Sequence, residues 1–108
     1  MTLKERNDKI EEFFNSCKEI LTSKGLDYAS KTDAYANFTD TANVTKFPPR
    51  KILLVLLHKH MRAIYNAVDS NPDNPTRNAE SFVESCRDAV NYLSILAVWP
   101  IKKGVKDE

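Results

Sequence analysis

The stretch KILLVLLHKHMRAIYNAV, residues 51–68, decides the fold of this chain. Residues 52–57 within it are consecutive apolar side chains. At about 3.6 residues per turn, such a run leaves no polar face for more than one full turn of an α-helix. The stretch therefore predicts a central helix whose first half needs neighbours on every side, from its own chain or from another copy.

The second half of this predicted helix has an apolar face and a charged face. Its apolar side chains recur at helical spacing at Leu57, Met61, Ile64, Tyr65 and Val68. Lys59, Arg62 and Asn66 share a different face. Because both cations are fixed on one rigid element, they suit a phosphate group.

Two further long helices are predicted, one before and one after the central helix. Thr2 and Glu5 have the spacing of a capping box at the start of the first helix, which runs to about Ser23. Gly25 suits the left-handed residue that follows a helix end. The last helix is predicted from Ala79 to about 98, where a Trp-Pro pair stops it.

Residues 24–49, between the first and central helices, form the least regular part of the chain. Two or three helical turns are expected over residues 34–43, and Pro49 suits the first turn of the central helix. The fold class expected is all-α: a compact bundle of three long helices plus one short helix, in a single domain over residues 1–108. Residues from about 101 onward are predicted to form a charged tail.

The composition narrows the classes of partner. Lys and Arg number 16 against 15 Asp and Glu, so the formal net charge is only +1, which disfavours binding to duplex nucleic acid. No apolar run approaches the ~20 residues needed to cross a bilayer, and the N-terminus has no signal peptide, so no membrane contact and a cytoplasmic location are expected. Cys17 and Cys86 fall on apolar stripes and are expected to be buried free thiols. A chain this short has a thin core, and a homo-oligomer is expected.

Few residues suggest catalysis. The sequence lacks the common hydrolase and zinc-protease motifs, and His58 and His60 point to different helix faces. Glu84 and Asp88 are four residues apart, so they could share a magnesium ion. The alternative is that Asp88 pairs with Lys59 or Arg62 of the central helix, because a half-buried carboxylate needs such a partner.

A third possibility is a nucleotide site built from three segments. Lys59 and Arg62 would hold phosphate. Aromatic rings at Tyr28, Tyr35 and Phe38 would stack on a base. Asn37, Asn91 and Asp88 would bond to the base or ribose.

Four short segments carry a resemblance to a known family: residues 17–28 (CKEILTSKGLDY), 37–38 (NF), 57–60 (LHKH) and 84–92 (ESCRDAVNY). They resemble the nucleotide-modification-associated domain family of small, mostly phage-encoded helical proteins. The resemblance implies a site made of Lys24, Asp27, Tyr28, Asn37, Phe38, Lys59, Asp88 and Tyr92. The group is distantly similar to the MazG-like nucleoside triphosphate pyrophosphohydrolases, which hold magnesium with Glu-x-x-Glu and Glu-x-x-Asp pairs. This chain has no Glu-x-x-Glu in its first helix and has Glu84-x-x-x-Asp88 in its last, so the resemblance implies a nucleotide pocket with too few carboxylates for two metals.

The function predicted from the sequence is therefore binding of a nucleotide or nucleotide-derived ligand, without catalysis or a cofactor. Such a protein would serve phage nucleotide metabolism or sequester a host nucleotide signal, which is an anti-defence role. One alternative is a magnesium-dependent nucleoside triphosphate pyrophosphohydrolase that uses Glu84 and Asp88. The other is a helical module that binds a protein partner through the apolar first half of the central helix.

Overall fold

The computed structural model describes residues 1–28, 34–75 and 79–101. These residues form four α-helices, and they contain no strand. The helices are α1 (Leu3–Tyr28), α2 (Ala36–Thr45), α3 (Pro49–Ser70) and α4 (Ala79–Ala97). The prediction of an all-α bundle with three long helices and one short helix is confirmed.

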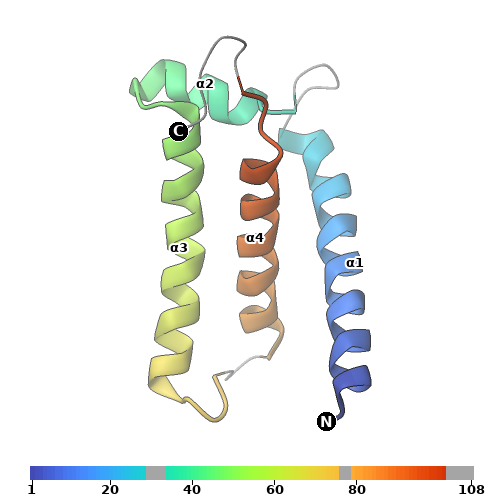
Figure 1. Ribbon diagram of the computed structural model, residues 1–108. Helices are drawn as coiled ribbons and strands as arrows, with labels where there is room; N and C mark the ends of the chain where they lie inside the picture. Colours follow the sequence, from blue (N-terminus) through green and yellow to red (C-terminus); the bar gives the residue numbers. More distant parts are fainter. Residues whose placement is uncertain (29–33, 76–78, 102–108) are drawn as a thin grey trace.

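The three long helices lie side by side with α4 in the middle (Figure 1). α3 packs on one side of α4 and runs antiparallel to it, while α1 packs on the other side and runs parallel. The short helix α2 lies across one end of the layer and packs on α3. The central position in space therefore belongs to α4, although the most apolar stretch of the sequence lies in α3.

Local sequence signals set the starts of two helices. The backbone N–H of Glu5 donates a hydrogen bond to the Thr2 hydroxyl (3.1 Å), and the Thr2 backbone N–H donates one to the Glu5 carboxylate (3.4 Å). This reciprocal pair is the predicted capping box. Pro49 occupies the first turn of α3, also as predicted, because its missing N–H has no intrahelical partner to lose there.

The predicted end of α1 near Ser23 is wrong. The helix continues through Gly25 to Tyr28. A glycine inside a helix costs only about 1 kcal/mol relative to alanine, and no nearby proline interrupts the backbone hydrogen bonds. The left-handed residue appears instead at Lys46, where φ is 65° and the backbone N–H donates to the Ala42 carbonyl (2.8 Å) to end α2.

The main core lies where α2, α3 and α4 meet. It consists of Phe38 and Ala42 from α2 with Ile52 and Leu53 from α3, and Leu53 is fully buried. Half-buried side chains pack around these four: Tyr35, Tyr92, Ile95, Leu96 and Trp99. Within the described part of the chain this core is small, and its residues come from one end of the layer.

The chain covers only part of the apolar run that opens α3. Ile52 and Leu53 are buried, but Leu54 is 48% exposed and Val55 is 70% exposed. A helix in a single layer has neighbours on two sides at most, so the other side chains of a continuous apolar run face outward. The first half of α3 was predicted to need neighbours on every side, and a single chain does not supply all of them.

We expect Leu53→Ala to lower the free energy of unfolding by about 2–5 kcal/mol, because it removes a fully buried side chain from a core with few members. Val55→Ala, two residues away and largely exposed, should change it by less than about 0.5 kcal/mol. Urea unfolding followed by far-UV circular dichroism measures both changes. Similar losses for the two variants would show that the core is not centred on Leu53.

Candidate functional site

His60 of α3 and two residues of α4 form a polar cluster between these helices. The Nδ1 atom of His60 lies 3.6 Å from the Asp88 Oδ2 atom. The imidazole also stacks on the Tyr92 ring, with 5.4 Å between ring centroids. Asp88 and Tyr92 are four residues apart, which places both on the same face of α4. His60 therefore lies at the interface between α3 and α4.

The predicted pairing of Asp88 with Lys59 or Arg62 is wrong, because His60 occupies that place. Each residue turns a helix by about 100°, so Lys59 points well away from its neighbour His60, and Arg62 points away by still more. Both cations are exposed, and neither forms an ion pair within the described part of the chain. They remain free to attract an anion from solution.

A row of aromatic rings continues from this cluster toward the C-terminal end of α4. The Phe38 ring lies 6.5 Å from the Tyr92 ring and 5.4 Å from the Trp99 ring, and Tyr35 stacks near Trp99 at 4.4 Å. The Arg50 guanidinium lies 5.1 Å from the Trp99 ring centroid and donates a hydrogen bond to the Pro100 carbonyl (2.8 Å). These contacts join α2, α3 and the segment after α4 into one unit.

Phe38 was predicted to stack on a base, and the structure gives it a different environment. Its side chain is 3% exposed and packs within the main core. A base cannot reach this ring without opening the contact between α2 and α3. Asn37, its neighbour, is half-buried in the first turn of α2.

Asn91 is buried and connects α4 to α1. Its side-chain Nδ2 donates a hydrogen bond to the backbone carbonyl of Cys17 at 3.1 Å. This bond pairs a buried side-chain donor with a backbone carbonyl, as buried polar groups require. Asn91 therefore faces α1, while Asp88 and Tyr92 face α3.

Among the described residues, no group of three or more His, Cys, Asp or Glu side chains has the geometry to hold a metal ion. Glu84 is exposed, and its proposed partner Asp88 is engaged with His60. Two helix carboxylates with one of them already paired are a weak ligand set for magnesium, which prefers octahedral oxygen coordination.

The two cysteines are free, with Cys17 buried and Cys86 half-buried. Burial raises the pKa of the Cys17 thiol, and the nearby Arg87 guanidinium opposes that rise only in part. Burial also raises the pKa of the Cys86 thiol. A raised pKa keeps a thiol protonated at neutral pH, so neither cysteine is an activated nucleophile.

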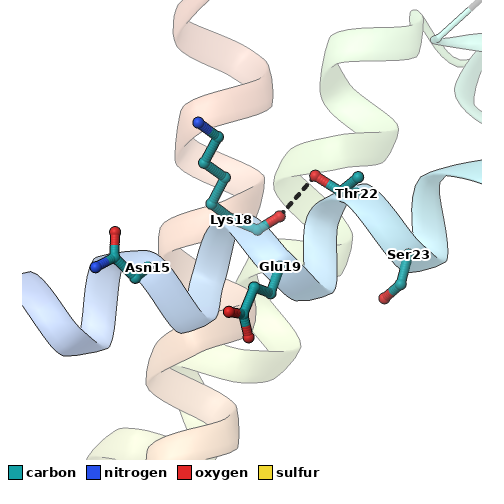
Figure 2. Close-up of a pocket in the computed structure, with 5 residues that line it drawn as sticks. All are labelled: Asn15, Lys18, Glu19, Thr22 and Ser23. Carbon is teal, nitrogen blue, oxygen red and sulfur yellow. Dashed lines mark hydrogen bonds between the residues drawn. The ribbon is translucent and has the colours of Figure 1, made fainter.

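Two surface hollows border α1. The larger is lined by polar side chains along one side of α1, and Figure 2 shows Thr22 donating its hydroxyl to the Lys18 carbonyl there (2.9 Å). The smaller, of about 280 Å³, lies between α1 and α4 and is lined partly by Cys17, Leu21 and Asn91. Neither is lined by Lys59, by Arg62 or by the aromatic row.

The structure thus brings together only some of the predicted site residues. Phe38, Asp88 and Tyr92 lie around the α3–α4 contact, Asn91 faces α1, and Lys59 and Arg62 face solvent. Lys24 is exposed near the end of α1, and the side chains of Asp27 and Tyr28 lie outside the described residues.

Sequence reasoning missed the residues that complete the aromatic row, Arg50 and Trp99. In the sequence, Trp99 is recognisable only as part of the signal that stops α4. Aromatic residues at 35, 38, 92 and 99 were the available signal, but nothing in their spacing tells which of them meet.

Comparison with protein families, with curated proteins and with solved structures finds no match to this chain. The resemblance to the nucleotide-modification-associated domain family therefore stays a prediction. Among residues 1–28, 34–75 and 79–101, no helix is both long enough and apolar enough to cross a bilayer.

We expect His60→Ala to lower the free energy of unfolding by about 1–3 kcal/mol, because it removes both the ring stack on Tyr92 and the pairing with Asp88. His60→Phe keeps a ring in place and should lose less. Lys59→Ala, an exposed change on the same turn, should stay within about 0.5 kcal/mol of the parent chain. Urea titration measures all three, and equal stability of the alanine variants would contradict a structural role for His60.

Proposed function

We propose that this chain is a helical protein-binding module that acts in the cytoplasm by packing exposed apolar side chains against a protein partner. The observation that carries the proposal is the apolar surface left uncovered on α3 and α4. Large apolar side chains on adjoining helices that face solvent together are typical of an interaction surface.

We define the open face as six side chains on one side of the layer: Leu54, Met61, Tyr65 and Val68 of α3, with Phe82 and Leu93 of α4. Tyr65 is 60% exposed and Leu93 is 50% exposed, while Met61 and Phe82 are half-buried. Isolated exposed apolar residues are common on protein surfaces, but a set that spans two neighbouring helices is not.

Helix geometry places these side chains on the same side of the layer. Met61 follows His60, which faces α4, and Leu93 follows Tyr92, which faces α3. One residue corresponds to a rotation of about 100°. Because α3 and α4 are antiparallel neighbours, the same rotation along each sequence directs both side chains to the same side of the layer.

The proposal predicts covalent capture of a partner at Tyr65 in the cell. With the photoreactive residue p-benzoylphenylalanine in place of Tyr65, irradiation should give a discrete adduct. The same residue in place of Phe47 should give none, although Phe47 is equally exposed at 62%, because it lies between α2 and α3 and outside the open face. Gel shifts measure the adducts and mass spectrometry identifies them. Absence of an adduct at Tyr65, or equal adducts at both positions, would refute the proposal.

A second candidate function is binding of a nucleotide-type anionic ligand, in phage nucleotide metabolism or in sequestration of a host nucleotide signal. It is favoured by one observation: Lys59 and Arg62 are exposed, three residues apart on α3, and unpaired within the described residues. Two cations on one helix turn attract a phosphate without displacing a resident carboxylate. Any base contact would have to involve groups other than the buried Phe38 ring.

This second function predicts heat on titration with a linear or cyclic nucleotide, in calorimetry with and without magnesium. Lys59→Ala should abolish that heat and leave helicity intact. Lys51→Ala, which removes an exposed cation at the start of α3, is the matched control and should retain it. If the heat persists in Lys59→Ala, or if no nucleotide gives heat, Lys59 does not bind a nucleotide. Magnesium-dependent product would support the pyrophosphohydrolase alternative instead.

A further inference from the structure

We infer that the partner on the open face is a second copy of this chain, with the two α3 helices antiparallel and crossing at Met61. This inference rests on the proposed protein-binding function and names the partner. It follows from the spacing of the apolar row on α3, from the charges that flank this row and from the surface area of the chain.

The apolar row on α3 has a spacing that is symmetric about Met61. Its members are Leu54, Leu57, Met61, Tyr65 and Val68. Successive members are three, four, four and three residues apart, so the row has the same spacing in both directions. Leu57 is half-buried, and both ends of the row are exposed.

A twofold interface uses the same patch on both subunits, so the patch must be complementary to itself in reversed orientation. With the axis at Met61, Leu54 of one copy would face Val68 of the other, and Leu57 would face Tyr65. Each side chain of the row would then lie opposite an apolar side chain of the other copy. A second copy presents a row with the same spacing in the reversed orientation, so the two rows match along their whole length.

The charges beside the row also favour the antiparallel arrangement. Lys51 and Asp69 lie near opposite ends of α3, and both are exposed. They are 18 residues apart, which is five helix turns at about 3.6 residues per turn, so they project from the same side. Antiparallel packing places the Lys51 end of one copy beside the Asp69 end of the other, whereas parallel packing places like charges together.

The surface area of the chain is consistent with a missing neighbour. Its accessible surface is 8815 Å², whereas about 6,100 Å² is typical of a compact monomer of this length. A stable interface of standard size buries about 800 Å² on each partner. The chain therefore has enough surface for one such interface, and the net charge of +1 gives little repulsion between copies.

Disulfide trapping of the purified full chain tests this inference. In a Cys86→Ala background, which leaves only the buried Cys17, Met61→Cys should form a disulfide-linked dimer under mild oxidation. Val55→Cys is the control, because Val55 is more exposed than Met61 but points to another side of α3. We expect dimer formation at least about tenfold faster for Met61→Cys, measured on non-reducing gels at micromolar protein. Equal rates, or no dimer at Met61, would overturn the inference.

A mixed experiment tests the orientation at two exposed positions, where cysteine should not disturb folding. Antiparallel packing predicts that Leu54→Cys and Val68→Cys cross-link to each other on mixing and that neither cross-links to itself. Self-linking of Leu54→Cys would overturn the antiparallel arrangement. The chain could instead sediment as a monomer at high micromolar concentration while position 65 captures a different protein in the cell. That result would contradict the inference that the partner is a second copy, but it would support the proposed protein-binding function.

Discussion

The constraint on which this structure depends is the continuous apolar run at the start of α3. Two of its residues, Ile52 and Leu53, supply half of the buried residues of the main core, and the fold is arranged to cover them with α2 and α4. Covering the remaining residues would need a helix on another side of α3. The third long helix does not provide it, because α1 packs on the far side of α4. The single chain therefore buries its main core and leaves a second apolar surface exposed to solvent.

The features predicted correctly from the sequence depend on residues close together in the chain. The capping box needs only Thr2 and Glu5, and the start of α3 needs only the two prolines before Arg50. The all-α class follows from periodicity that is repeated over many residues. The end of α1 was harder to place, because a glycine is tolerated within a helix as well as after one, and only the surrounding structure decides.

The candidate site was less predictable, because it depends on which faces of distant helices meet. One of the two interpretations of Asp88 paired it with Lys59 or Arg62 of the central helix, but a rotation of one residue distinguishes His60 from Lys59. Phe38 is aromatic, and an aromatic ring can pack in a protein core as well as stack on a nucleotide base. The packing between α2 and α3 assigns this ring to the core, and no local pattern in residues 34–45 indicates that outcome.

The attachment of α1 has a consequence for how the molecule opens. α1 packs chiefly on α4, and one buried amide hydrogen bond, from Asn91 to the Cys17 carbonyl, joins the two helices. The other three helices share the main core and the aromatic row. Cooperative units of a protein separate where contacts are sparse, so we expect α1 to behave as a foldon of its own. Its backbone amides should exchange with solvent through a partial opening that costs less free energy than global unfolding, while the amides of α3 exchange only when the whole bundle unfolds.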